Sequence, residues 1–167
     1  MDRPSRKQNR LEHYDYSTPN AYFLTICTEN RKSLFWKDVG AIIDRPEKAS
    51  LSVWGEIVRD CIEVIPLHYP AVSVDRYVIM PDHVHLLLQI CTDSHGRSMI
   101  APTISNVVRQ MKGAASKRAG FGIWQKGFYD HIIRSEADDR EIWEYIEGNP
   151  ARWTSKRQSA AGEGEYL

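Results

Sequence analysis

The fold is decided by the stretch Tyr77-Val78-Ile79-Met80-Pro81-Asp82-His83-Val84-His85-Leu86-Leu87-Leu88-Gln89-Ile90. Its second half, from His83 to Ile90, is a short apolar run directly after the turn signal Pro81-Asp82, which is typical of a strand. Residues two apart on a strand point to the same face, so we expect His83 and His85 to project together. Two imidazoles on a rigid strand could begin a metal site. Taken alone, however, the stretch fits better two histidines that are each hydrogen-bonded to a neighbour on a half-buried face.

Outward from this stretch, β-rich runs alternate with amphipathic helical patterns. Strands are predicted at residues 21–28, 72–80, 83–90 and 127–134, and helices at about 50–65, 102–119 and 135–149. The first helix is expected to end at Pro66, the second at Gly120 and the last at Asn149-Pro150. The order β-α-β-β-α-β-α is that of the split βαβ, or ferredoxin-like, fold with one added helix. We therefore predict an α+β domain with an RRM-like antiparallel sheet, a central histidine strand, helices on one face, and a C-terminal helix outside the sheet.

The length and composition predict one folded domain. A chain of 167 residues with 42% hydrophobic residues and five tryptophans can bury a real core. We predict a polar arm at residues 1–19, a single domain at 20–153 and a flexible tail at 154–167. The N-terminus is too polar for a signal peptide, and no apolar run is long enough to span a bilayer. Three scattered cysteines form no CxxC pattern, which favours the reducing cytoplasm.

The charges are unevenly distributed although the formal net charge is zero. No acidic residue lies between Ser94 and Tyr129, and that segment carries Arg97, Arg109, Lys112, Lys117, Arg118 and Lys126. Such asymmetry fits a basic face for a polyanion, although most basic segments are simply solvated surface.

The predicted last helix carries Tyr145 and Asn149, four residues apart and so on one helical face. Asn149 could give its side-chain oxygen to a metal, and Tyr145 could act as a nucleophile beside it. On the pattern alone, a simpler reading fits better: Tyr145 lies at the edge of the core, and Asn149 stops the helix before a proline.

Three blocks of the sequence together resemble a known family. They are Met80–Leu87 (MPDHVHLL), Trp124–Arg134 (WQKGFYDHIIR) and Tyr145–Trp153 (YIEGNPARW). The first resembles the HUH motif (His, bulky hydrophobic residue, His) of single-tyrosine transposases. The other two are similar to the C-terminal half of these enzymes, and the Asn-Pro after the tyrosine is closest to the REP-associated tyrosine transposases. The resemblance runs from about Tyr22 to Trp153.

The resemblance implies cutting and joining of single-stranded DNA at hairpin-associated sites in the nucleoid. It implies that Tyr145 attacks the scissile phosphate, forms a 5′-phosphotyrosine link and frees a 3′-hydroxyl. It assigns His83, His85 and Asn149 as ligands of a Mg²⁺ or Mn²⁺ ion. Relatives in insertion sequences often have Gln in place of Asn149. Ligand type alone would also permit zinc. Family members act either as monomers or as homodimers.

The other candidates rank lower. Tyr129 is a second candidate nucleophile, which we expect to be fixed by packing in its strand, and His131 is more consistent with a structural or DNA-contact role. With DNA as the suspected partner, phosphate contacts are assigned to the basic residues Arg109, Lys112, Lys117, Arg118 and Lys126.

A binding module without chemistry is the alternative function, since ferredoxin-like sheets also occur in hairpin DNA- and RNA-binding domains. No RNP-like aromatic signature is visible on the strands. A degenerate family member is disfavoured because His83, His85 and Tyr145 are all present.

Overall fold

A computed structural model describes residue 15 and residues 17–37, 50–91 and 103–162 of the chain. Within these residues four strands form one antiparallel sheet: β1 (Ala21–Cys27), β2 (Val72–Ile79), β3 (His83–Ile90) and β4 (Tyr129–Ile132). The strand order β2-β3-β1-β4 places the histidine strand β3 in the interior of the sheet. This confirms the predicted α+β, ferredoxin-like arrangement with the histidine strand at its centre.

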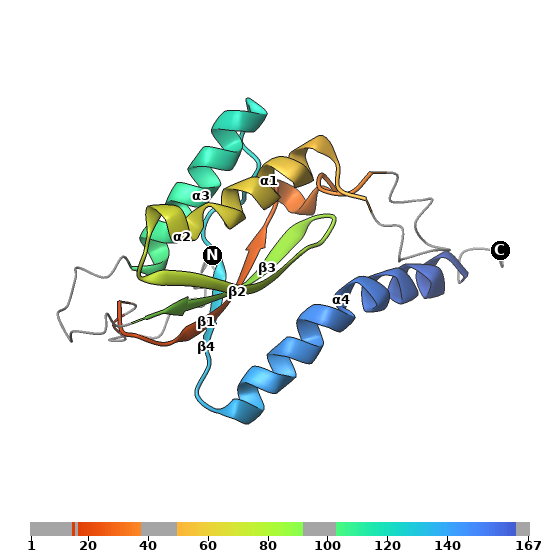
Figure 1. The fold of residues 1–167 in the computed structure, drawn as a ribbon. Coiled ribbons are helices and arrows are strands. Elements are labelled where there is room, and N and C mark those ends of the chain that lie inside the picture. Colours follow the sequence, from red (N-terminus) through yellow and green to blue (C-terminus); the bar gives the residue numbers. More distant parts are fainter. Residues whose placement is uncertain (1–14, 16, 38–49, 92–102, 163–167) are drawn as a thin grey trace, which may run out of the picture.

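The helices lie on both sides of this sheet (Figure 1). On one side are α1 (Val53–Glu63), α2 (Ile65–His68) and α3 (Ile104–Ala119), and on the other is the long helix α4 (Glu136–Gly162). A short 3-10 turn, η1 (Glu29–Arg31), follows β1. The predicted layer of helices on one face, with a C-terminal helix approaching from outside, is therefore present.

Alternation along the strands divides the apolar residues between two cores. Leu86 and Leu88 of β3 belong to the larger core under α1 and α3, whereas Leu87 belongs to a smaller core with Ile142 and Ile146 of α4. Because His85 and His83 are two and four residues from Leu87, their side chains lie on the face that α4 approaches.

The helix ends follow the expected local chemistry. Ser52 caps α1 by accepting a hydrogen bond from the Gly55 amide at 3.1 Å. Thr103 caps α3 in the same way through the Asn106 amide at 3.3 Å. Gly120 ends α3 with a φ of 82°, a left-handed conformation that favours glycine.

Two predicted proline boundaries were wrong. Pro66 lies inside the short helix α2, and α1 ends earlier, at Glu63. Pro150 lies inside α4, which continues to Gly162. Proline removes one main-chain donor, but a helix packed along its length can continue through it. Pro150 does pack, since it lines a groove beside β2.

Several remaining boundaries differ from the predictions. Strand β4 is shorter than the predicted 127–134, since Gly127 adopts a φ of 80° before the strand begins. Most of the predicted arm at 1–19, Pro102 at the N-terminal end of the predicted second helix, and residues 163–167 lie outside the described residues. None of the described helices combines the length and the hydrophobicity needed to cross a bilayer.

Candidate active site

His83 and His85 meet on the α4 side of the sheet. Both are buried, with 7% and 3% of their surface exposed, and their Nε2 atoms lie 3.1 Å apart. Each Nδ1 has its own partner: that of His83 lies 2.6 Å from Asp82 Oδ1, and that of His85 lies 2.9 Å from Thr25 Oγ1. These contacts at Nδ1 fix the orientation of the two rings, so that both Nε2 atoms face the same point.

Asp82 fixes the tautomer of His83. Burial raises the pKa of Asp82, but the hydrogen bond with His83 and the positive charge of Arg31 together hold it below its usual value. Arg31 Nε lies 2.9 Å from the second carboxylate oxygen. An ionised carboxylate can only accept, so His83 donates from Nδ1 and leaves the lone pair of Nε2 for a ligand.

His85 is neutral at ordinary pH. Burial, together with the neighbouring His83 and Arg31, lowers its pKa to about 3. A neutral imidazole is the form that ligates metals, so no proton needs to be removed from His85 before a cation binds.

Tyr145 of α4 reaches the same place. Its ring centroid lies 5.2 Å from that of His85, at an interplanar angle of 70°. Phe23 of β1 stacks on His85 at 5.2 Å and also meets the Tyr145 ring edge-on at 6.1 Å. Tyr145 is 40% exposed, so this phenol is beside the histidines and still accessible from solvent.

Asn149 is buried one helical turn beyond Tyr145, with 8% of its surface exposed. Its side-chain Nδ2 has no hydrogen-bond partner among the described residues. The next residue, Pro150, lines a groove together with Val78, and Val78 is the register partner of His85. A buried amide without a partner is unusual. A 180° rotation about the Cβ–Cγ bond would exchange Nδ2 with the amide oxygen. The oxygen would then occupy the position without a partner, where it could bind a cation or accept a hydrogen bond from water.

The donor atoms fit a divalent cation. Two nitrogens bound at about 2.1 Å and at a right angle would lie about 3.0 Å apart, close to the 3.1 Å between the two Nε2 atoms. No group of three or more His, Cys, Asp or Glu side chains in the described part of the chain could hold a metal. A site here would therefore use two imidazoles and the Asn149 amide, leaving positions open for water and phosphate.

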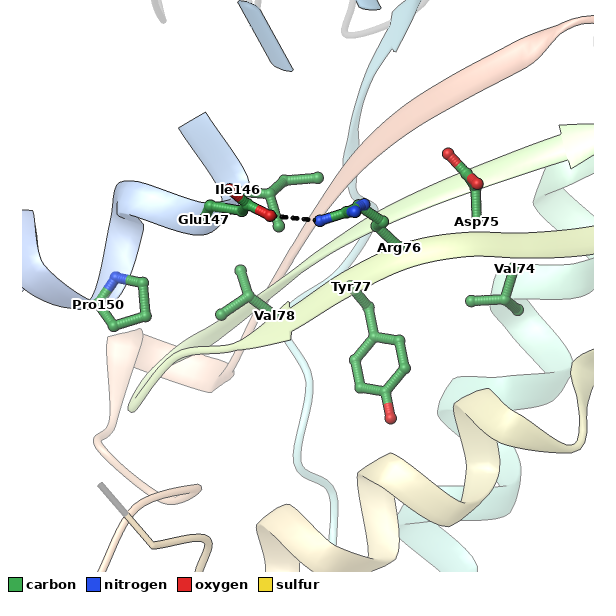
Figure 2. A pocket seen from close by; sticks show the side chains of 8 residues that line it. All are labelled: Val74, Asp75, Arg76, Tyr77, Val78, Ile146, Glu147 and Pro150. Atoms are coloured by element: carbon green, nitrogen blue, oxygen red, sulfur yellow. Dashed lines mark hydrogen bonds and ion pairs between the residues drawn. The ribbon is translucent and has the colours of Figure 1, made fainter. Parts of the chain in front are cut away.

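The helix that carries Tyr145 is held against the edge strand β2. Figure 2 shows the groove between them, lined by Val74, Asp75, Arg76, Tyr77, Val78, Ile146, Glu147 and Pro150. Arg76 Nη1 lies 2.6 Å from Glu147 Oε1, and its guanidinium lies over the ring of Trp143. Arg76 of β2 thus contacts two residues of α4, Trp143 and Glu147, which precede and follow Tyr145 in the sequence.

Replacing Arg76 with alanine should lower the free energy of unfolding by about 1–2 kcal/mol, the sum of a partly exposed ion pair and a cation–π contact. The melting temperature should fall by a few degrees, measured by calorimetry. Glu147→Gln removes only the ion pair and should cause about half this loss. An unchanged melting temperature in Arg76→Ala would show that the contact does not hold α4.

Contrary to the prediction, packing does not fix the side chain of Tyr129. It is 54% exposed at the start of β4, on the sheet face that carries the histidines. Phe128 takes the buried position instead. His131, two residues on and on the same face, lies 2.9 Å from Asp138 at the start of α4. His131 therefore joins the strand to the helix that carries Tyr145.

Four of the five basic residues predicted to contact DNA lie on α3, in the layer on the other side of the sheet from the histidines: Arg109, Lys112, Lys117 and Arg118. The fifth, Lys126, is exposed. It follows Gln125, whose amide bonds to the Cys27 carbonyl, and Cys27 is the register partner of His83. Lys126 thus lies at the histidine end of the sheet.

Two of the basic residues have partners outside α3. Lys112 Nζ donates to the carbonyls of Gln125 and Gly127 at 2.7 and 2.9 Å, and burial lowers its pKa. Arg118 is paired with Asp60 at 2.8 Å. These contacts tie α3 to neighbouring segments. DNA binding by the five residues stays a prediction, and Lys117 and Lys126 are the exposed lysines among them.

The residues that contact the histidine rings, Asp82, Thr25 and Phe23, were not predicted from the sequence. Asp82 was recognised only as a turn residue, although a carboxylate next to a ligand histidine is itself a signal. Thr25 and Phe23 carry no such signal. They reach His85 only through the pairing of β1 with β3, in which Thr25 lies directly opposite His85.

The fold and the site define a class of protein: a ferredoxin-like sheet with paired histidines on its central strand, faced by a tyrosine on the following helix. No protein-family model matches the chain. An uncharacterised protein from Haemophilus influenzae is 34% identical over 167 residues, covering 89% of this chain and 89% of that protein.

Two further relatives carry a name. A Haemophilus influenzae protein provisionally named a REP-associated tyrosine transposase is 25% identical over 146 residues, covering 83% of this chain and 74% of that protein. The solved structure of a REP-associated tyrosine transposase bound to a REP hairpin has the same fold. Its TM-score is 0.63 at 21% identity, covering 86% of this chain and 74% of that chain. The chain is thus similar in sequence to a protein of that provisional name and shares the fold of a solved REP-associated tyrosine transposase.

Proposed function

We propose that this protein cuts and rejoins single-stranded DNA beside a hairpin, with Tyr145 as the nucleophile. The observation that carries the proposal is the meeting of the Tyr145 ring with the paired histidines, 5.2 Å from His85 across the contact of α4 with the sheet. The solved relative bound to a REP hairpin supports hairpin DNA as the partner. Such a substrate would place the protein in the cytoplasm, on the DNA of the nucleoid.

The chemistry assigned to Tyr145 is an in-line attack on phosphorus. Its phenol oxygen forms a bond to the scissile phosphate and loses its proton to solvent, and the bond from phosphorus to the 3′ oxygen breaks. The products are a 5′-phosphotyrosine and a DNA end whose 3′ oxygen takes up a proton. A second 3′-hydroxyl can then attack the phosphotyrosine and release Tyr145, because the energy of the ester bond is kept.

A tyrosine with a reference pKa near 10 is almost fully protonated at neutral pH and is therefore a weak nucleophile. The other residues of the site would compensate for this by holding a cation. His83, His85 and Asn149 would hold Mg²⁺ or Mn²⁺. When bound, such an ion would polarise the phosphate oxygens and ease departure of the 3′ oxygen. Asp82 and Thr25 orient the imidazoles, and Phe23 fixes the angle between His85 and Tyr145.

The proposal is tested by trapping the covalent link. A labelled pool of hairpin oligonucleotides with randomised single-stranded flanks is incubated with the protein and Mn²⁺, then separated on a denaturing gel. We expect a labelled band at the mass of protein plus DNA, absent when EDTA replaces Mn²⁺. Hairpin binding without any denaturation-resistant adduct would instead support the non-catalytic binding module.

Salt dependence tests the exposed lysine at the histidine end of the sheet. Lys126→Ala should reduce the slope of log affinity against log salt by roughly one unit, the loss of one phosphate contact. Arg140→Ala removes an equal charge from an exposed position among acidic residues of α4 and should leave the slope unchanged. Affinities for a hairpin with a single-stranded flank are measured by fluorescence anisotropy. Equal slopes for wild type and Lys126→Ala would exclude this contact.

A further inference from the structure

Tyr129 is an exposed aromatic residue without an assigned role. It is 54% exposed, more than Tyr145, and no ring contact or hydrogen bond of its side chain is found within the described part of the chain. A single exposed aromatic side chain is common on protein surfaces. The position of Tyr129 in the sheet therefore decides whether its exposed ring has a role.

The sheet register places Tyr129 in line with the candidate active site. Thr25 of β1 is paired with His85 on one side and with Tyr129 on the other. Directly paired residues project to the same face of a sheet. The 2.9 Å contact between Thr25 Oγ1 and His85 Nδ1 shows which face this is. With strands about 4.8 Å apart, Tyr129 lies about 10 Å from His85 across the sheet.

The α4 helix leaves this part of the face open. After its first turn α4 packs toward the opposite edge of the sheet, where Arg76 of β2 holds Glu147 and Trp143. Tyr145 lies between that contact and the open part, and it is itself 40% exposed. A strand of DNA whose phosphate lies at Tyr145 and His85 can thus continue over Thr25 toward Tyr129.

The local charge suits a nucleic acid strand. Lys126, three residues before Tyr129, is exposed at the histidine end of the sheet. Arg31, at the same end, keeps 51% of its side-chain surface exposed while it holds Asp82. An aromatic ring beside positive charges is the arrangement that holds unpaired bases, because every base can stack and every phosphate is negative.

We propose that Tyr129 is a stacking platform for an unpaired base close to the scissile phosphate. This inference deepens the proposed function and rests on it, since it assumes that single-stranded DNA reaches Tyr145. In this role the aromatic ring of Tyr129 matters and its hydroxyl does not. That separates a platform from a second nucleophile, for which the hydroxyl would be essential.

The test measures binding without cleavage, so it does not depend on the chemistry. A fluorescent 12-nucleotide oligo(dT) and an abasic strand of the same length are titrated in EDTA against wild type, Tyr129→Phe and Tyr129→Leu. Since Tyr129 is exposed, all three proteins should have the same melting temperature. Tyr129→Leu should bind oligo(dT) at least about 5-fold more weakly. Tyr129→Phe should stay within about 2-fold of wild type, and the abasic strand should bind all three equally.

Photocrosslinking locates the base directly. With 5-iododeoxyuridine in the oligo(dT), irradiation should attach DNA to tryptic peptide 127–134, which contains Tyr129. This crosslink should remain in Tyr129→Phe and disappear in Tyr129→Leu. Equal oligo(dT) affinity for wild type and Tyr129→Leu, no detectable oligo(dT) binding by wild type, or a crosslink that survives the loss of the ring would each overturn the platform. Absence of the Tyr145 adduct with intact crosslinking would count against the proposed function alone.

Discussion

Tyr145→Phe is expected to abolish the covalent protein–DNA adduct completely while hairpin binding stays within about 2-fold of wild type. The variant loses one oxygen atom and keeps the ring that meets His85 and Phe23. Tyr145 is 40% exposed, so the loss of its hydroxyl should cost little stability. The adduct is measured on denaturing gels with labelled hairpin DNA and Mn²⁺, and binding is measured by anisotropy in EDTA.

The matched control for this experiment is Tyr129→Phe, which removes the hydroxyl of an exposed tyrosine on the same side of the sheet. It should form the adduct at close to the wild-type rate. The structure removes one reason for ranking Tyr129 second, since packing does not fix it. Of the two tyrosines, however, Tyr145 is the one in ring contact with His85. An adduct that survives in Tyr145→Phe and vanishes in Tyr129→Phe would reverse the assignment.

His83→Ala and His85→Ala should each lower the rate of adduct formation by more than about 100-fold, with hairpin affinity nearly unchanged. The reason is that binding should depend on phosphate contacts and DNA shape, whereas the cation serves the chemical step. Calorimetric titration of Mn²⁺ into each variant gives a second measurement that needs no DNA. Since each variant removes one of two converging Nε2 donors, Mn²⁺ affinity should fall at least about 10-fold.

The control for both variants is His131→Ala. His131 is 54% exposed at its side chain and bonded to Asp138, on the same face of the sheet but away from the two Nε2 atoms. Its loss should leave Mn²⁺ affinity unchanged. A histidine variant of β3 that cleaves at the wild-type rate, or that binds Mn²⁺ as the wild type does, would remove the basis for a metal site at His83 and His85.

The central part of the fold was predictable because its signals are local. The apolar run after Pro81-Asp82 gave the β3 strand, and the two-residue spacing of His83 and His85 gave their common face. The four-residue spacing of Tyr145 and Asn149 likewise gave a common helical face, and both residues lie on the sheet side of α4. Periodicity within one element is set by backbone geometry, so the sequence alone reveals it.

What could not be predicted depends on how elements pair and pack. Nothing in the sequence indicates that Thr25 lies opposite His85 or that Tyr129 lies opposite Thr25, because strand register is a property of two segments. The continuation of α4 through Pro150 has a similar origin. A proline is a strong local stop signal, and here packing of the helix beside β2 overrides it.

The central claim is that Tyr145 attacks DNA, and peptide mapping of the wild-type adduct tests it most directly. Trypsin separates the two candidate nucleophiles, because Tyr145 is the only tyrosine in peptide 141–152 and Tyr129 the only one in peptide 127–134. After nuclease treatment of the adduct, mass spectrometry should find the remaining nucleotide on peptide 141–152, with the mass added at Tyr145. A nucleotide found on peptide 127–134, or no modified peptide from a reaction that has cleaved the DNA, would contradict the account.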